Sequence, residues 1–367
     1  MTATVLEIVE KVKTSPVRTA APDNFVVRKA EQISAKIVID HPHISLYCLD
    51  DEHRQAWFVE TPPEVDLSQA PFYYVAQYDH ALRLISVPYA EFHRLAEAVP
   101  LAKLIIIHST GRCGSTVISK ALNAVEGVLS LSEPDVYTQV SHMRQLDNSR
   151  DAEYAALLKS ATRIYCRNTP IVALKFRAMC IQIGDLLYEA FPGATNLFLY
   201  REMVSWARSM GAEFRPIAER RVPVQEFPIH RRTMAPLSIP FAAEHGREAN
   251  PVELATLTWL SIMEKYLALC DAGMPFLALR YEDIQAHPKQ VLAAMLDYCG
   301  LAADVEQIYA VFATDAQEGT VFSRATRQER TVFPLETEDF AQMQSVLASR
   351  QVIQSPDFIA PYTRRFD

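Results

Sequence analysis

The stretch LIIIHSTGRCGSTVISKAL, Leu104–Leu122, joins an apolar run, a turn with two glycines and a helical pattern that opens with Ser115 and Thr116. The 367-residue chain has only ten glycines, and two of them, Gly111 and Gly114, fall in this turn. A strand that feeds a tight turn and a helix directs free N–H groups and the positive end of the helix dipole at one point. The pattern therefore predicts an anion-binding loop.

Arg112 lies between these glycines and adds a fork of hydrogen-bond donors, while the two hydroxyls can each bond a phosphate oxygen. The loop differs from the triphosphate-binding pattern G-x-x-x-x-G-K-[ST], because only two residues separate the glycines and no lysine follows the second one. The turn therefore suits one phosphate and not three. The alternative interpretation is an ordinary glycine turn capped by Ser115.

After residue 103, short continuous apolar runs alternate with helical patterns. Strands that are apolar on both faces are typical of a parallel sheet with helices on both sides, so we predict a doubly wound α/β domain. The predicted strands are Leu104–His108, Val128–Ser132, Ile171–Phe176, Thr195–Tyr200 and Phe276–Arg280, and the predicted helices are Asp151–Arg167, Met179–Phe191, Met203–Gly211, Pro251–Ala272 and His287–Cys299.

The chain changes character near Pro100, which predicts a β-rich N-terminal appendage over residues 1–100 and the α/β domain over residues 101–367. Residues 212–250 interrupt the rhythm of the second part with prolines, arginines and little periodicity. A loop of this length in a compact domain is usually functional or mobile. Alternating stretches predict appendage strands at Ile44–Cys48, Ala56–Glu60 and Phe72–Gln77.

Composition excludes several classes of function. The net charge of -8 and the pI near 5.7 argue against nucleic acid as a partner. The six cysteines form no C-x-x-C pair, and no run of eighteen apolar residues or secretory leader occurs. We therefore expect a cytoplasmic protein without a membrane span, a disulfide framework or a metal site. The composition carries no information on oligomeric state.

The run FLYREMVSWARSM, Phe198–Met210, places Arg201 at the end of a predicted strand and Ser209 two turns along the next helix. The carboxyl ends of parallel strands are where α/β sheets bind ligands. Together with STGRCGST, Ser109–Thr116, this run resembles sulfotransferases that use 3′-phosphoadenosine-5′-phosphosulfate (PAPS). In that family a glycine turn binds the 5′-phosphosulfate, and an arginine and a serine eight positions apart grip the 3′-phosphate.

The resemblance is to the bacterial and carbohydrate-acting members, with Cys113 where serine is usual, and it implies PAPS as co-substrate. A looser match, Gly319–Arg330, corresponds to the basic segment that relatives bring over the nucleotide. In Trp259–Leu301, which is similar to the family's late strand and following turn, Tyr281 is interpreted as structural. The implied donor contacts are Ser109, Thr110, Gly111, Arg112, Cys113, Gly114, Ser115, Thr116, Arg201, Ser209, Ser323, Arg324 and Arg327.

Sulfuryl transfer needs a base for the acceptor and positive charge near the moving group. Glu133 ends the strand after the loop helix, and the carbohydrate-acting relatives use a glutamate in a comparable place, so it is the predicted base. Lys175 ends the next strand, and with Arg112 it is predicted to neutralise the sulfate. His108 and His230 are the alternative bases, and Glu133 could instead be a structural ion-pair partner.

The acceptor stays open at this point: a small molecule, lipid or sugar with a hydroxyl, or an amine. The segment 212–250 is expected to close over it, and the arginines there either select an anionic acceptor or are solvated charges, which is the favoured interpretation. Two other classes of function compete. One is a nucleotide or small-molecule kinase with a degenerate phosphate loop, and the other is a non-catalytic relative that only binds the nucleotide.

Overall fold

The computed structural model describes residues 1–13, 15, 18–210, 227–318 and 335–366. Its centre is a five-stranded sheet in the order β10-β9-β6-β8-β7, in which every neighbouring pair is parallel. All five strands were predicted, and their bounds lie within one residue of the expected ones. The strands are β6 Lys103–Ser109, β7 Val128–Ser132, β8 Ile171–Lys175, β9 Thr195–Tyr200 and β10 Leu277–Arg280.

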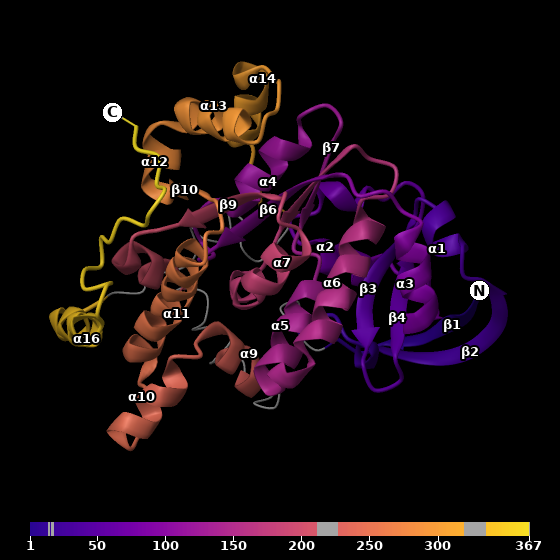
Figure 1. The fold of residues 1–367 in the computed structure, drawn as a ribbon, viewed down its shortest axis with the longest axis horizontal. Helices are drawn as coiled ribbons and strands as arrows, with labels where there is room; N and C mark the ends of the chain where they lie inside the picture. The colour runs from indigo at the N-terminus through magenta and orange to yellow at the C-terminus, as the bar shows by residue number, and fades with distance from the viewer. Residues whose placement is uncertain (14, 16–17, 211–226, 319–334, 367) are drawn as a thin grey trace.

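Helices cover both faces of this sheet, which confirms the predicted doubly wound arrangement (Figure 1). Alternate residues of β6 enter different cores, Ile105 and Ile107 on one side and Leu104 and Ile106 on the other. That is why each strand reads as a continuous apolar run. One face carries α4 Ser115–Asn123, α12 Tyr281–Ala286 and α13 Pro288–Tyr298, and the other carries α5 Val136–Leu146, α6 Asp151–Tyr165, α7 Gly184–Ala190 and α11 Pro251–Asp271.

The N-terminal part forms a second, antiparallel sheet in the order β2-β1-β5-β4-β3, as the predicted β-rich appendage requires. Two of its strands were predicted. The third predicted strand, Phe72–Gln77, is wrong, because α2, Tyr73–Asp79, occupies this stretch and buries Tyr73, Tyr74 and Gln77 on one helical face. The strands are β1 Thr2–Lys11, β2 Phe25–Ser34, β3 Ile44–Asp50, β4 Gln55–Glu60 and β5 Arg83–Pro88.

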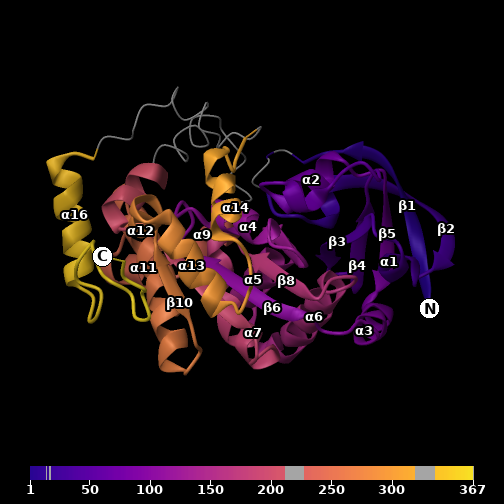
Figure 2. The same ribbon diagram turned by 90° about the horizontal axis from the view of Figure 1, so that it is seen from above.

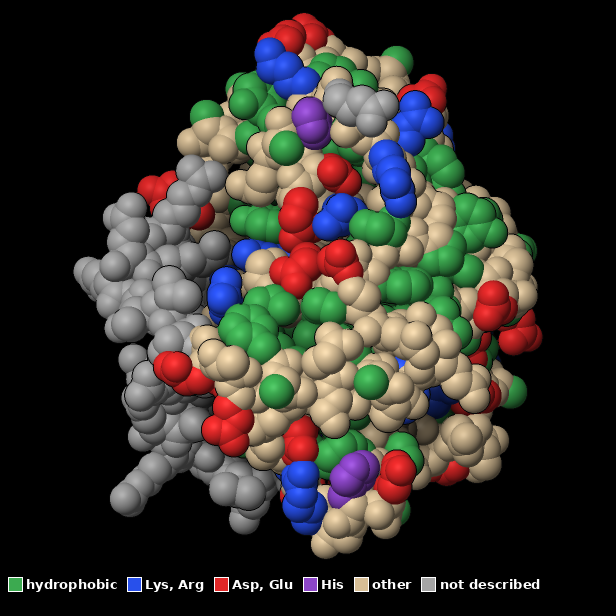
Figure 3. All heavy atoms as spheres, turned by 90° about the vertical axis from the view of Figure 1, so that its left-hand side faces the viewer, with side chains coloured by type: hydrophobic (Ala, Val, Ile, Leu, Met, Phe, Trp, Pro, Cys, Tyr) green, Lys and Arg blue, Asp and Glu red, His purple; other side chains and the backbone are tan. Residues whose placement is uncertain are grey.

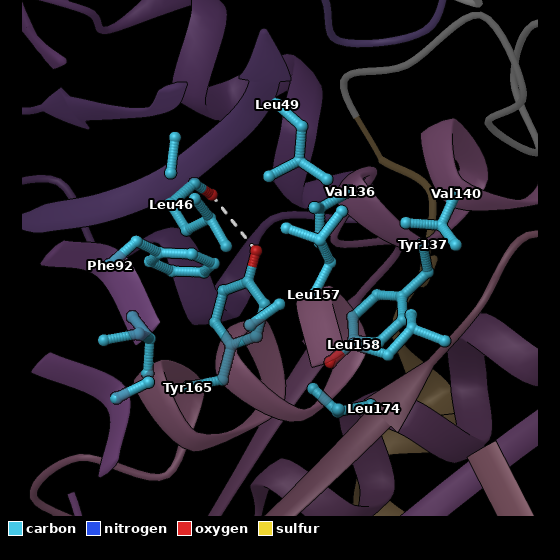
Figure 4. Close-up of a cluster of buried hydrophobic side chains, with 14 of the residues drawn as sticks. Leu46, Leu49, Phe92, Val136, Tyr137, Val140, Leu157, Leu158, Tyr165 and Leu174 are labelled. Carbon is cyan, nitrogen blue, oxygen red and sulfur yellow. Dashed lines mark hydrogen bonds between the residues drawn. The ribbon is translucent and has the colours of Figure 1, made fainter. Parts of the chain in front are cut away.

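The two sheets share a hydrophobic core (Figure 4). Phe92 on α3, Tyr89–Glu97, and Leu46 on β3 pack against Leu157 and Tyr165 on α6. The Tyr165 hydroxyl donates a hydrogen bond to the Leu46 carbonyl at 3.1 Å. The antiparallel sheet is therefore attached directly to the helical layer formed by α5 and α6.

Figure 2 shows the antiparallel sheet at one end of the molecule and α16, Thr337–Ala348, at the other. The described part of the segment 212–250 is helical, with α9 Phe227–Met234 and α10 Ser238–His245, so the expectation of a long irregular loop is wrong for these residues. On the face in Figure 3, acidic and basic side chains lie interspersed. Within the described ranges, no helix has the length and apolarity needed to cross a membrane.

Candidate functional site

A cavity of about 710 Å³ lies at the carboxyl end of the parallel sheet. Its walls come from the turn between β6 and α4, the ends of β7, β8 and β9, the start of α12, and the segment that follows β1. The volume is within the range of about 300–1,000 Å³ typical of small-molecule sites. Because β6 is the central strand, the ends of β9 and β10 and the ends of β8 and β7 lie on opposite sides of the phosphate loop, Ser109–Thr116. We refer to the two parts of the cavity as the half over β9 and β10 and the half over β8 and β7.

The phosphate loop has the geometry of an anion site. Gly111 and Gly114 have φ values of 72° and 82°, and Arg112 between them also has a positive φ of 54°. The α4 helix begins after Gly114 without a side-chain cap, so the interpretation of a turn capped by Ser115 is wrong. The first-turn N–H groups of α4 are thus available to an anion at the cavity.

The side chains or backbone of seven predicted loop residues line the cavity. Cys113 does not, which corrects its assignment as a donor contact. Its thiol lies in the core between α4 and the sheet and donates to the Leu199 carbonyl at 3.3 Å, and this burial raises the pKa of the Cys113 thiol. The lining residues are Ser109, Thr110, Gly111, Arg112, Gly114, Ser115 and Thr116.

Arg201 and Ser209 line the same cavity, next to the loop. The Arg112 Nε donates to Ser209 Oγ at 3.2 Å, and Arg201 Nη1 donates to the Arg112 carbonyl at 3.3 Å. Arg201 also donates through Nε to Ser205 Oγ at 2.9 Å, so its nearest hydroxyl partner is one turn earlier than the predicted one. The two predicted anion-binding groups, the phosphate loop and the Arg201–Ser209 pair, therefore lie side by side; we call them the anion grips.

Buried aromatic side chains fix the position of Arg201. The Trp259 indole N–H donates to the Arg201 carbonyl at 3.0 Å, and the guanidinium carbon lies 4.2 Å from the centre of the Tyr281 ring. Tyr281, which was interpreted as structural, also lines the cavity. A guanidinium held on a ring face is both oriented and partly shielded from water.

Glu133 and Lys175 meet at the other half of the cavity. Glu133 follows β7 with a φ of 65°, a conformation that costs free energy for a non-glycine residue. Its N–H donates to the Lys175 carbonyl at 2.7 Å, and the two side chains form an ion pair in which Lys175 is only 4% exposed. The ends of β7 and β8 thus present a carboxylate and an ammonium together at the cavity.

A second ion pair lies beside the first. Arg177 contacts Asp135 at 3.2 Å, and the Asp135 side chain is fully buried. Asp135 also accepts a hydrogen bond of 2.7 Å from the Ala20 N–H. The segment that follows β1 is therefore bonded to the site, and its residues Ser15, Arg18 and Asp23 contribute to the wall.

The histidines separate into two groups. His230 on α9 lines the cavity together with His142 on α5, which the sequence did not single out, and their ring centres are 5.5 Å apart. His108 does not line it: this side chain is 1% exposed between Phe176 and Phe276, and burial lowers its pKa to about 3. Because His108 cannot reach an acceptor in the cavity, its prediction as an alternative base is wrong.

Two further aromatic residues, Tyr309 on α14, Val305–Tyr309, and Phe312, line the cavity, and the segments that carry them pack against α4. Their rings are stacked with centres 5.8 Å apart. Sequence reasoning missed them, since no motif surrounds them. The predicted contacts Ser323, Arg324 and Arg327 lie outside the described residues. Among the residues that the structure covers, no group of three His, Cys, Asp or Glu side chains is placed to hold a metal ion.

The sheet and its glycine turn define a doubly wound α/β protein with a phosphate-loop-like fold. No protein-family model matches the chain, and no curated protein matches its sequence. Its structure is similar to the sulfotransferase domain from the curacin biosynthetic pathway, with 16% identity over 69% of this chain and 99% of that one and a TM-score of 0.38.

Two other solved structures are similar at the same level. The sulfotransferase domain of the Synechococcus PCC 7002 olefin synthase is 17% identical over 69% of this chain and 96% of that one, with a TM-score of 0.39. Retinol dehydratase, solved with androsterone and the inactive cofactor PAP, is 11% identical over 83% of this chain and 95% of that one, with a TM-score of 0.36.

Proposed function

We propose that the protein is a sulfotransferase that moves a sulfuryl group from PAPS to an acceptor hydroxyl. One observation carries the proposal: a single cavity brings together the uncapped phosphate loop, the Arg201–Ser209 pair and the Glu133–Lys175 pair. These groups come from the ends of four strands, β6, β7, β8 and β9, and from the helix that follows β9. Two anion grips beside a carboxylate and an ammonium suit a doubly phosphorylated donor and an acceptor that must lose a proton.

The half of the cavity over β9 and β10 is assigned to the donor nucleotide. The N-terminus of α4, with Ser115 and Thr116, would hold the 5′-phosphosulfate, and Arg201 with Ser209 would hold the 3′-phosphate. The stacked rings of Tyr309 and Phe312, which also line the cavity, offer the adenine a flat apolar contact. A kinase would need a lysine on the γ-phosphate, and the loop provides none.

In the proposed reaction, the acceptor oxygen forms a bond to sulfur while the bond between sulfur and the 5′-phosphate oxygen breaks. The acceptor proton passes to the Glu133 carboxylate, and PAP (3′,5′-adenosine bisphosphate) leaves with the electron pair of the broken bond. Neutralisation of Glu133 leaves the Lys175 ammonium free to stabilise the leaving oxygen, since the two groups are ion-paired beforehand. Arg112 stabilises the sulfate oxygens.

We also propose that residues 1–100 are an appendage that completes the acceptor half, with a boundary between α3 and β6. This assignment is supported by appendage residues that line the cavity, among them Ser15, Arg18, Asp23, Phe72 and Tyr74. The six free cysteines are compatible with the cytoplasmic location that we propose.

A comparison of thermal shifts tests the proposal. We expect PAP to raise the unfolding temperature and ATP with Mg²⁺ to leave it nearly unchanged. Binding of a nucleotide at 100 times its dissociation constant stabilises the fold by about 2.7 kcal/mol, which such a shift detects easily. Stabilisation by ATP–Mg²⁺ and not by PAP would favour the kinase instead.

A further inference from the structure

In the half of the cavity over β7 and β8, every described basic side chain that lines the wall is paired with a carboxylate. Its three basic side chains each face one carboxylate: Lys175 with Glu133, Arg177 with Asp135, and Arg18 with Asp23. The donor half, in contrast, contains the guanidinium groups of Arg112 and Arg201 beside the phosphate loop. The proposed donor half therefore contains positively charged side chains that can bind phosphate, whereas the basic side chains of the proposed acceptor half are already paired with carboxylates.

The surfaces between these ion pairs are mainly apolar. The described arginines of the segment 212–250 do not line the cavity, and Arg231 pairs with Glu248 at 2.6 Å instead. The segment contributes two apolar side chains and a histidine from α9. The apolar lining residues of this half are Phe72, Tyr74, Phe176, Met179, Ile229 and Met234.

Tyr74 is a rigid aromatic wall. The Arg177 guanidinium lies 5.1 Å from its ring centre, and the Lys13 ammonium lies 4.5 Å from it. Contact with two cations fixes the ring plane before any acceptor arrives, and a preformed aromatic surface loses little entropy on binding. Lys13 does not line the cavity, and burial lowers its pKa to about 8.

The imidazoles of His142 and His230 provide the polar part of the same wall. Burial lowers the pKa of His142 to about 4. Burial, together with the nearby Arg177 and His142, lowers the pKa of His230 well below its usual range. Both rings are therefore uncharged at neutral pH, and each has one donor and one acceptor nitrogen. His142 Nε2 has no hydrogen-bond partner among the residues that the structure describes, and a ligand hydroxyl can supply one.

We propose that the acceptor is an uncharged molecule with a mainly apolar body and a reacting hydroxyl, held by Tyr74 and by the His142–His230 pair. A cationic or anionic acceptor would bring an unmatched charge beside three ion pairs that are already neutral, and such a charge is costly to desolvate. The inference rests on the proposed function, because it assigns this half of the cavity to the acceptor.

Three phenols that differ in one substituent test the inference: 4-ethylphenol, the cationic tyramine and the anionic 4-hydroxyphenylacetate. PAP is titrated first by calorimetry, and each phenol is then titrated into protein saturated with PAP. We expect 4-ethylphenol to bind at least about tenfold more tightly than either charged phenol, a difference of about 1.4 kcal/mol. Equal or tighter binding of a charged phenol, or no binding of 4-ethylphenol, overturns the inference.

Failure of the proposed function gives a different result. If PAP does not bind, the donor assignment is wrong, and the same phenol series is run on the protein alone. The ranking of the three phenols then decides the inference about the cavity wall independently of the donor. A preference for the uncharged phenol supports the wall as described, and any other ranking overturns it.

Substitutions at His230 provide the matched test. His230→Arg adds an unmatched cation, and we expect it to shift the preference at least about tenfold toward 4-hydroxyphenylacetate with PAP affinity unchanged. His230→Gln stays uncharged and should keep the original preference, as should His80→Arg, which changes an exposed histidine of the appendage. If His230→Arg does not fold, Met234→Lys on the same helix serves instead. An unchanged ranking in the charged variant overturns the inference.

Discussion

Glu133 is the residue on which the proposed chemistry depends. Its positive φ and its N–H bond to the Lys175 carbonyl hold the carboxylate at the end of β7, where it pairs with the Lys175 ammonium. A glutamate avoids this backbone conformation unless its surroundings impose it, and strain of this kind is typical of functional sites. The ion pair also means that Glu133 must exchange a contact with Lys175 for the acceptor proton.

Glu133→Gln should therefore lower turnover without weakening the donor complex. We expect turnover to fall by about 10²–10⁴-fold, the usual contribution of a general base. The dissociation constant of PAP should stay within about twofold, because no donor contact is removed. Transfer from PAPS to 4-ethylphenol is measured, with Glu126→Gln, an exposed change, as control. A variant as active as the parent would show that Glu133 is not the base.

We expect the buried imidazole of His108 to lower the free energy of unfolding in acid. Neither of its ring nitrogens has a hydrogen-bond partner within the described part of the chain, and burial lowers its pKa from 6.5 to about 3. Above pH 6.5 the ring is neutral in both states, and below it only the unfolded chain takes up the proton. The free energy of unfolding should fall by about 1.4 kcal/mol per pH unit from this group as the pH drops toward 3.

His108→Phe, which suits a site between two phenylalanine rings, should remove this contribution. Urea unfolding at pH 7.5, 5.5 and 4.5 measures the free energy of unfolding of both proteins. We expect this free energy to decline less with falling pH in the variant than in the parent. Equal declines would mean that His108 is protonated in the folded protein.

Some site residues could be predicted from the sequence and others could not, for a physical reason. Arg201, Glu133 and Lys175 each end an apolar strand, so their meeting at one sheet edge follows from the parallel order. Cys113 was misassigned because the pattern does not tell which way a turn side chain points. Tyr281 and His142 lie on helices, and only the packing of α12 and α5 brings them to the cavity.

At the scale of elements, the glycine turn between β6 and α4 controls the loop amides. An alanine Cβ at position 114 would meet Ile284 and Tyr281 at 3.7 Å, an ordinary contact, so the cost of such a change comes from the φ of 82°. A left-handed conformation costs a residue with a side chain about 1–2 kcal/mol.

Gly114→Ala should accordingly lower the free energy of unfolding by about 1–2 kcal/mol and weaken PAP binding, since the loop relaxes away from its open geometry. Gly193→Ala is the control, because its φ is not positive and no atom lies within 4 Å of the added Cβ. Urea unfolding and calorimetry measure both quantities. If the Gly114→Ala protein is destabilised but binds PAP with unchanged affinity, the loop does not contribute to donor binding.

The parallel strands were predictable from the sequence because both of their faces are buried. In the antiparallel sheet β3 and β4 were predicted, whereas β1, β2 and β5 were not. β2 is mostly exposed, and register shifts interrupt the alternation of β1, so neither has the simple pattern that a half-buried strand produces. At the start of α2, Phe72 and the first two helical residues form three aromatic residues in a row, which mimics a strand. Burial of Gln77, which donates to Ser45 Oγ at 2.7 Å, favours the helix.

At the scale of the whole molecule, the shared core couples the appendage to the α/β domain. Phe92 is fully buried and lies in the cluster that contains Tyr165 and Leu174. The appendage also supplies part of the cavity wall. We therefore expect the two parts to unfold together, although their sheets are separate.

Phe92→Ala should lower the free energy of unfolding by about 3–5 kcal/mol and keep one cooperative transition. Leu82→Ala, at a side chain that is 57% exposed, is the control and should change it little. Circular dichroism and tyrosine fluorescence followed through urea unfolding measure the transition. Two separated transitions would mean that the sheets are independent domains.

The central claim is that the phosphate loop and the Arg201–Ser209 pair grip one doubly phosphorylated nucleotide, and titration calorimetry with PAP tests it most directly. We expect the parent protein to bind PAP, and Arg201→Ala to bind it about tenfold to a hundredfold more weakly, as the loss of charge-assisted hydrogen bonds implies. Arg208 is exposed on the helix that follows β9, and its guanidinium lies near the Phe340 ring of α16. Arg208→Ala should therefore bind PAP like the parent. No heat of binding with the parent, or equal affinity in Arg201→Ala, would contradict the account.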